Sequence, residues 1–422
     1  MKFKLLTIIL LAFTINISAQ KYLACSDMNY RDDVQTVLLH PTGLDLDKPV
    51  IYLDNMKNQL HLQFDILADN APYLYYTIVH CDNKWQPSDL QKNEYIAGFF
   101  QDEIDNFTFS LNTFVNYVHY DLVFPNENLM PKISGNYLLV VTGEDSKDIY
   151  FTRRFYVVED RARIAATMPR YPFDLNLGIN KQEVDLEIVY PDVFNSRADQ
   201  YSNVTIQQNG RWDNAVFGLK PTYVYPEKLS YINNEKTVFE SGNQYLRINT
   251  SNFNNRPEKT KSVYREDNYY VVTLFDDGKR STHNYIEDED LFGEKYIYLE
   301  RNNLDATREG DYAQVDFFLK WPQYMIDKDV YIMGAITDWR LDENAKMEYD
   351  PERRGYKKSL FLKQGYYDYM YAVKDNASGI TSLAPVNGDF WETNNIYHIF
   401  VYLFDPIQNY DKLIGYKTIK AH

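Results

Sequence analysis

Cysteine is almost absent from this chain, which has two cysteines among 422 residues. Several catalytic patterns are also missing: His-Glu-x-x-His, the Gly-x-Ser-x-Gly elbow, the P-loop and the dinucleotide-binding glycine pattern. The seven histidines are scattered, and the acidic run at residues 287–290 lacks the alternating oxygen ligands and glycine of a calcium loop. The sequence therefore predicts a protein that is not an enzyme and that holds no cofactor or metal.

Long apolar runs are missing as well. Residues 5–17 are apolar and follow a basic start, but they are shorter than the roughly 20 residues that a membrane span needs. This layout predicts a cleaved signal peptide at residues 1–19, and therefore an exported protein. The residues before Cys25 form part of a lipobox, so a lipoprotein is the alternative. Because residues 20–22 separate Cys25 from the apolar run, simple cleavage after Ala19 is favoured.

The charge balance excludes two classes of partner. The chain has 44 basic and 60 acidic residues, a formal net charge of -16. An acidic protein of this kind is repelled by nucleic acids and by anionic membrane surfaces, so neither is expected as a partner. The 38 Tyr and 24 Phe favour strands over helices. The chain is too long for one compact core, so several domains are expected.

The strand pattern is clearest in residues 98–141. Phe107, Phe109 and Leu111 alternate with polar residues, which predicts a half-buried strand. Residues 137–141 form an unbroken apolar run, which is typical of a central strand covered on both faces. Together these patterns predict a β-sandwich.

Strand candidates of this kind recur along the chain. They predict an all-β protein made of tandem immunoglobulin-like or early-set-like β-sandwich domains. The expected boundaries after the signal peptide are an N-terminal sandwich at 20–160, a second β-rich domain at 161–310 and a C-terminal early-set-like sandwich at 311–422. A short repeated motif supports this arrangement, because Gly135, Gly242 and Gly365 each precede a strand that begins with a tyrosine. Such a tyrosine can pack its ring while its hydroxyl binds a backbone group.

Two neighbouring residues, His80 and Cys81, resemble a catalytic pair. On a strand, consecutive side chains point to opposite faces, so His80 cannot activate the Cys81 thiol, and a structural role is favoured. An exported protein can also form a disulfide, here between Cys25 and Cys81. The alternative is a buried thiol at Cys81 and a free Cys25, and both remain open because spacing alone does not set the geometry.

The C-terminal region resembles the early-set sandwiches of glycogen-binding and branching-enzyme modules. Residues 334–339 read GAITDW and residues 365–369 read GYYDY, close to the Gly-x-Phe-Asn-x-Trp and Gly-x-Tyr-x-Tyr phrases of those modules. Ile336 and Thr337 replace the Phe-Asn, so glycan binding does not follow from the resemblance.

Three aromatic residues in this region form a candidate binding platform. Trp339, Tyr356 and Trp391 could together present an exposed surface to a glycan or a partner protein. Alternatively, they cover the edge of the C-terminal core. Aromatic side chains are enriched in both settings, so the sequence leaves the choice open.

Seven short phrases carry a second, more extensive resemblance. They are HCDNKW at 80–85, EYIAG at 94–98, FPN at 124–126, SGNY at 134–137, TRRF at 152–155, QNGRWDNA at 208–215 and LKPT at 219–222. In this order and spacing they resemble the type IX secretion system plug proteins of Bacteroidota. The resemblance spans most of the mature chain.

That resemblance implies a non-catalytic function. It implies a soluble periplasmic subunit, monomeric within a hetero-complex, at the periplasmic face of the outer membrane. There it would close the periplasmic opening of the outer-membrane translocon barrel at rest, by steric occlusion. The residues themselves leave one main alternative, a periplasmic glycan-binding sandwich protein. A glycan-acting enzyme with an early-set accessory domain is a third, but no catalytic domain is visible in the sequence.

Overall fold

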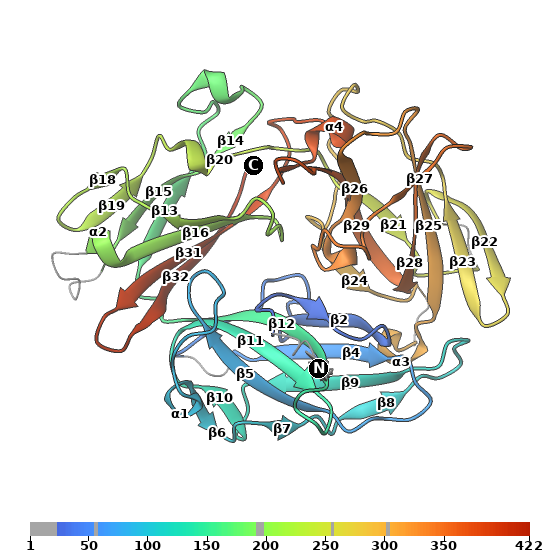
Figure 1. The fold of residues 1–422 in the computed structure, drawn as a ribbon, viewed down its shortest axis with the longest axis horizontal. Coiled ribbons are helices and arrows are strands. Elements are labelled where there is room, and N and C mark those ends of the chain that lie inside the picture. Colours follow the sequence, from blue (N-terminus) through green and yellow to red (C-terminus); the bar gives the residue numbers. More distant parts are fainter. Residues whose placement is uncertain (1–22, 55–57, 191–197, 255–256, 301–303) are drawn as a thin grey trace, which may run out of the picture.

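The described residues form three β-sandwiches grouped around a common centre (Figure 1). A computed structural model describes residues 23–54, 58–190, 198–254, 257–300 and 304–422. The all-β prediction is confirmed. The expected signal peptide, residues 1–19, lies outside the described residues. Within the described residues, no helix is both long enough and apolar enough to cross a membrane.

The first sandwich packs two sheets around one aromatic and aliphatic core. One sheet contains β1 (Met28–Asn29), β12 (Ile149–Val158), β11 (Gly135–Thr142), β5 (Tyr75–Cys81) and β7 (Asp102–Glu103), with β3 (Val50–Tyr52) beside β12. The facing sheet contains β2 (Val34–Pro41), β4 (Leu60–Ile66), β9 (Val118–Phe124) and β8 (Phe107–Phe109). A small pair, β6 (Ile96–Gly98) and β10 (Leu129–Pro131), follows α1 (Lys92–Tyr95).

Strand β11 is the centre of this sandwich. All of its residues are buried, as the apolar run at 137–141 predicted. Tyr137 and Leu139 face the core of the first sandwich. Leu138 and Val140 belong to a second apolar cluster, which includes residues of β31 (Ile396–Asp405) and β32 (Tyr410–Lys420). The outer face of the sheet is therefore covered by another part of the chain.

The prediction of a half-buried strand is wrong for β8. All three of its residues are exposed, including Phe107 and Phe109. The register pairs Phe107 with Tyr120 and Phe109 with Val118, whose side chains belong to the core. The two rings therefore lie on the core side of the sheet, at an edge that the opposite sheet does not cover.

The second sandwich includes the last two long strands of the chain. One sheet contains β13 (Arg163–Thr167), β15 (Asp185–Val189), β19 (Lys228–Tyr231) and β18 (Tyr223–Val224). The other contains β17 (Val216–Leu219), β16 (Ser202–Gln208), β31 and β32. A further pair joins β14 (Gln182–Glu183) to β20 (Val238–Phe239), and the short helices are α2 (Ala198–Tyr201), η1 (Leu175–Leu177) and η2 (Glu235–Thr237).

The third sandwich is inserted between β20 and β31. One sheet contains β21 (Leu246–Asn249), β29 (Gly365–Asp375), β24 (Lys295–Ile297), β26 (Lys328–Met333) and β30 (Thr381–Ser382). The other contains β22 (Thr260–Glu266), β23 (Tyr269–Leu274), β25 (Tyr312–Lys320), β28 (Gly355–Lys363) and β27 (Glu348–Asp350). Its short helices are α3 (Ala306–Glu309), α4 (Ala384–Asn387) and η3 (Ala335–Thr337).

The strand pairing departs from the boundaries expected between 161–310 and 311–422. Strand β23 pairs with β25 across the expected boundary at residue 310. Strands β31 and β32 leave the C-terminal region and extend the sheet of β16. The reason is that strand pairing between distant segments is not encoded in local alternation, which marks strands but not their partners.

The repeated glycine–tyrosine motif forms the same tyrosine hydrogen bond in two of the sandwiches. The Tyr137 hydroxyl donates a hydrogen bond to the Ile133 carbonyl at 2.8 Å, and the Tyr367 hydroxyl donates to the Lys363 carbonyl at 2.5 Å. Each tyrosine thus ties the start of its strand to a carbonyl four residues earlier. Tyr245, in the remaining copy, instead accepts a hydrogen bond from the Asn209 side chain.

Candidate functional site

The first and second sandwiches meet through an apolar joint. The outer face of the sheet of β11 and β12 packs against β31 and β32 in one cluster, whose buried members are Val50, Cys81, Trp85, Leu138, Val140, Tyr156, Val158, Phe400, Tyr402 and Leu413. The rings of Tyr156 and Phe400 stack with centroids 4.2 Å apart. The Tyr402 hydroxyl donates to the Asn136 side-chain oxygen at 2.8 Å, and the backbone and side-chain N–H groups of Asn83 donate to the Asp411 carboxylate at 3.1 and 2.9 Å, so buried polar groups in this joint find partners across it.

The quoted phrases at 80–85, 152–155 and 208–215 converge on this joint. The guanidinium of Arg154 lies 4.9 Å from the centroid of Trp85 and 3.9 Å from the centroid of Trp212. It also donates two hydrogen bonds to the Cys25 carbonyl, at 3.0 and 2.9 Å. A cation held between two indole rings is a strong, directional contact. Three separated phrases therefore build one connection between sandwiches and the N-terminal segment.

His80 and Cys81 point to opposite sides of β5, as the strand argument predicted. The His80 ring lies among Tyr95, Tyr137 and Tyr410, and burial lowers its pKa to about 4. Cys81 faces the joint instead. The side chains therefore do not form a nucleophile–base pair.

The two cysteine sulfurs lie next to each other. Sγ of Cys81 is 3.4 Å from Sγ of Cys25, and both thiols are free. The hydrogen bond from Cys81 is the largest cause that lowers the pKa of Cys25, and Arg154 adds to it against the effect of burial. The thiolate is the reactive form of cysteine, so this geometry favours reaction at Cys25.

All three sandwiches meet at η3 of the third sandwich. A Cβ atom at Gly210 would lie 2.2 Å from the Trp339 ring, and one at Gly293 would lie 2.3 Å from it. Next to the ring, Asp338 forms ion pairs with Arg153 and with Lys295, each at 3.1 Å. Burial acts to raise the pKa of Asp338, but the two cations outweigh burial and hold that pKa below its usual value. An aromatic ring and a charge cluster thus fix the centre of the molecule.

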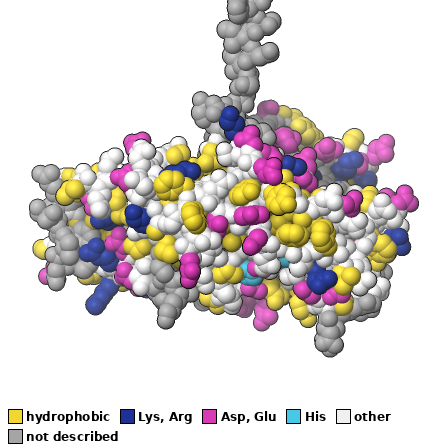
Figure 2. Space-filling view, turned by 90° about the horizontal axis from the view of Figure 1, so that it is seen from below, with side chains coloured by type: hydrophobic (Ala, Val, Ile, Leu, Met, Phe, Trp, Pro, Cys, Tyr) yellow, Lys and Arg dark blue, Asp and Glu magenta, His cyan; other side chains and the backbone are white. Residues whose placement is uncertain are grey.

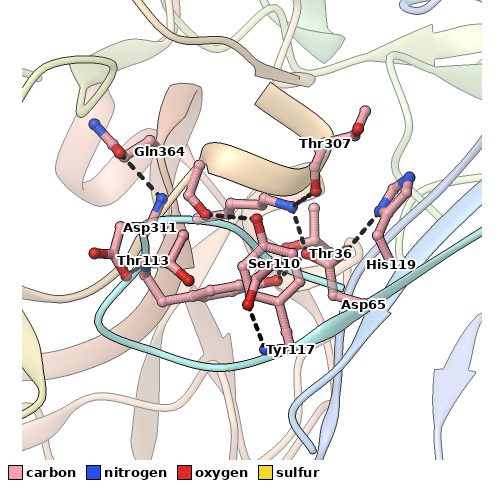
Figure 3. Close-up of polar contacts among 12 residues, drawn as sticks. Thr36, Asp65, Ser110, Thr113, Tyr117, His119, Thr307, Asp311 and Gln364 are labelled. Carbon is pink, nitrogen blue, oxygen red and sulfur yellow. Dashed lines mark hydrogen bonds and ion pairs between the residues drawn. The ribbon is translucent and has the colours of Figure 1, made fainter. Parts of the chain in front are cut away.

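The first and third sandwiches share a buried ion pair (Figure 3). Asp65 of β4 accepts hydrogen bonds from Lys363 at 2.6 Å and from the Tyr312 hydroxyl at 2.7 Å. His119 of β9 lies 2.7 Å from the other carboxylate oxygen. Burial acts to raise the pKa of Asp65, but Lys363 and His119 outweigh it and lower that pKa, so the carboxylate is ionised.

Further polar contacts extend this interface. The Thr36 and Tyr312 hydroxyls are 2.6 Å apart, and Lys363 also donates to the Thr307 carbonyl at 2.6 Å. The Asp311 carboxylate accepts from the backbone N–H groups of Phe114 and Val115, at 2.9 and 3.2 Å. The interface is therefore specified by hydrogen bonds between residues far apart in sequence.

Comparison with known proteins gives two informative matches. The family model described as the type 9 secretion system plug protein first domain matches residues 34–159. A crystal structure of a hypothetical protein from Parabacteroides merdae is 31% identical, with a TM-score of 0.90, and the match covers 94% of this chain and 99% of that chain. The chain belongs to the type 9 secretion system plug protein family.

Other matches are distant. The C-terminal domain of the Streptococcus agalactiae AgI/II polypeptide BspA is 9% identical and covers 90% of this chain and 97% of that chain, with a TM-score of 0.16, too low to support an argument. No curated protein matches the chain. Membership in the plug family indicates a role related to type 9 secretion, a place in the cell envelope and a structural rather than catalytic character.

The candidate aromatic platform is not assembled in this plug-family protein. Tyr356 is buried in the core of the third sandwich. Trp339 lies at the central junction against Tyr245. Trp391 lies elsewhere, 3.9 Å from the Arg170 guanidinium. The three side chains therefore lie in different surroundings and do not form one platform. Among the described residues, no group of His, Cys, Asp and Glu is arranged to hold a metal ion.

Sequence reasoning missed the Asp65–Lys363 network and the exposure of the Phe107 and Phe109 rings at the edge of the first sandwich. Asp65 and Lys363 stand 298 positions apart, and each is an ordinary charged residue in its local pattern. That edge did carry a local signal, the alternation at Phe107 and Phe109. That signal reports which face of a strand is apolar, and not whether another sheet covers it.

Proposed function

We propose that this protein is a periplasmic plug subunit of the type IX secretion system. It is exported by a cleaved signal peptide and acts at the periplasmic face of the outer membrane. In the resting state it closes the periplasmic opening of the translocon barrel by steric occlusion. It acts as a monomer within the hetero-complex, without catalysis or a cofactor.

The observation that carries this proposal is the union of three sandwiches into one body. A plug has to resist deformation across a wide pore, which separately moving domains would not do. Interfaces between domains are commonly polar and allow relative motion unless they are large and apolar. Here the first sandwich is joined to the second by an apolar cluster and to the third by a buried ion pair. These contacts, with family membership, support an occluding role.

The positions of the aromatic residues do not favour the glycan-binding alternative. A sugar platform needs aromatic faces that are exposed and close together. Tyr356 is buried, while Trp339 and Trp391 pack against other parts of the chain. The positions of these three residues therefore favour the plug hypothesis over the glycan-binding hypothesis.

Affinity purification from the native envelope tests the proposal. His422 is exposed, so a tag placed after it leaves the contacts between the three sandwiches intact. Solubilised envelopes from the tagged strain should yield a very large outer-membrane barrel, identified by mass spectrometry. The control is the same tagged strain without the barrel gene. If no barrel is recovered from the tagged wild-type strain, the proposal fails, and retention on a glycan column would favour the alternative.

A further inference from the structure

The free edge of the first sandwich carries exposed aromatic side chains. We define the aromatic edge as Tyr73, Phe99, Phe100, Phe107, Phe109 and Leu111, each of which is at least 42% exposed. The Phe107 and Phe109 rings contact one another, with centroids 6.0 Å apart. Single exposed apolar residues are common on protein surfaces, but exposed apolar side chains that contact one another, as Phe107 and Phe109 do, mark an interaction site.

The arrangement of strands explains why this edge is bare. Phe107 and Phe109 lie on the core side of β8, at the end of their sheet. The opposite sheet ends at β7, which is only two residues long. The rings therefore extend beyond the cover that the opposite sheet provides, and they remain in contact with solvent.

The other surfaces of the first sandwich are already occupied. The outer face of β11 and β12 packs on β31 and β32, and Asp65 and His119 on the outer face of β4 and β9 meet the third sandwich. In Figure 1, β6, β7 and β8 lie at the bottom, on the side away from the other two sandwiches. Most of the aromatic edge thus faces outward from the assembled molecule, while Leu111 at its end lies beside the third sandwich, where its backbone N–H donates to the Arg308 carbonyl at 2.8 Å.

The chain segment that carries most of the edge is acidic. Residues 93–131 contain no Lys or Arg, and their acidic members are Glu94, Asp102, Glu103, Asp105, Asp121 and Glu127, of which Asp121 lies on the outer face of β9, 2.6 Å from His61. Figure 2, which views the molecule from below, shows acidic side chains among the hydrophobic ones across the middle of this face. Apolar rings within an acidic rim are complementary to an apolar groove within a basic rim.

We propose that the aromatic edge docks into an apolar groove flanked by Lys and Arg on a partner protein. Resting on the proposed function, that partner is the periplasmic rim of the translocon barrel. The phenylalanine rings anchor the contact, since buried aromatic side chains supply most of the affinity of protein interfaces. The acidic rim accelerates and orients docking through its charge. The first sandwich therefore enters the pore mouth, with the other two behind it.

Paired substitutions test this docking. In Phe107→Ser/Phe109→Ser the anchor rings are removed, and in Glu103→Lys/Asp105→Lys two acidic residues of the rim are replaced by cations. The matched control is Tyr223→Ser/Tyr225→Ser, which removes two aromatic residues of similar exposure from the second sandwich. Binding of each purified mature chain to the solubilised, immobilised barrel is measured at low and high salt. Circular dichroism and thermal melting confirm that each variant is folded.

The expected results differ between the variants. Removal of the rings should weaken binding about 30-fold or more, as for interface hot spots. Charge reversal at these two positions should slow association, and binding should then weaken less with added salt than it does for the wild type. The control should bind as the wild type does. If the wild-type chain does not bind the barrel at all, the proposed function fails. If it binds and both edge variants bind equally well, or if the edge proves to join two copies of this chain, the docking surface is wrong.

Discussion

At the scale of single residues, Asp65 shows how charge is used to hold this molecule together. Its carboxylate is buried, and its countercharge, Lys363, comes from another sandwich. A buried ion pair is costly to form, because both groups lose their hydration. Its value lies in specificity, since either charge without the other is much worse. The pair therefore selects one relative position of the first and third sandwiches.

Replacement of Lys363 tests this account. Lys363→Met leaves the Asp65 carboxylate buried without its cation, which should lower the free energy of unfolding by about 3–5 kcal/mol. Asp65→Asn/Lys363→Met removes both charges and should be less destabilised than the single variant. Urea unfolding at neutral pH, followed by fluorescence, measures both. A double variant that is less stable than Lys363→Met would contradict the charge argument.

The cysteine pair supports a second prediction at this scale. We propose that Cys25 and Cys81 form a disulfide after export, passing two electrons and two protons to an oxidised dithiol protein of the envelope. The adjacent sulfurs and the lowered pKa of Cys25 favour this reaction. Non-reducing peptide mapping of protein purified from the native envelope should recover both residues in one linked peptide. Complete alkylation of both thiols before reduction would disprove it.

The Cys81→Ser variant distinguishes a stabilising bond from a functional thiol. Because Cys81 faces the joint and not His80, the variant should lower stability modestly, with at most a modest effect on secretion-related phenotypes. Thermal melting and envelope permeability measure the two effects. Loss of function without loss of stability would show that the thiol itself acts.

At the scale of secondary structure, alternation and apolar runs predicted individual strands well. The apolar run at 137–141 lies within β11, and the alternation at Phe107 and Phe109 marked β8, although β8 is exposed rather than half-buried. Strand partners were predicted poorly, because pairing depends on contacts between distant segments. The sequence therefore indicated the sandwiches but not the insertion of the third within the second. It likewise gave no signal for the Asp65–Lys363 pair.

The contact between Trp339, which follows η3, and the turn after β16 leads to a prediction at the same scale. In Gly210→Ala the new methyl group would overlap the Trp339 ring, so the ring or the turn has to move. Such overpacking should cost about 1–3 kcal/mol of stability. Gly278→Ala is the control, because nothing lies within 4 Å of its added Cβ. Thermal melting compares the two variants.

A double substitution separates this contact from a local effect of alanine. If Trp339 is the obstacle, Gly210→Ala/Trp339→Phe should be more stable than the sum of the single variants implies, since a smaller ring leaves room for the methyl group. Additive losses would show that the two residues do not interact. Equal stability of Gly210→Ala and Gly278→Ala would show that the junction is loosely packed.

At the scale of the whole molecule, the joints make one body from three domains that could otherwise move independently. The apolar cluster joins the first and second sandwiches, the Asp65 network joins the first and third, and the Trp339 junction brings all three together. One side of the first sandwich remains free and carries the aromatic edge. A rigid body with one exposed docking surface suits reversible closure of a pore, because the contact can be moderate in size and still block passage.

Outer-membrane permeability is the most direct test of this closure. A pore that passes folded proteins would leak large antibiotics if it stayed open between transport events. Deletion of the gene for this protein should therefore raise sensitivity to such antibiotics while the barrel remains assembled, and further deletion of the barrel should restore the wild-type level. Unchanged permeability in the single deletion, with the barrel present in normal amounts, would contradict the plug.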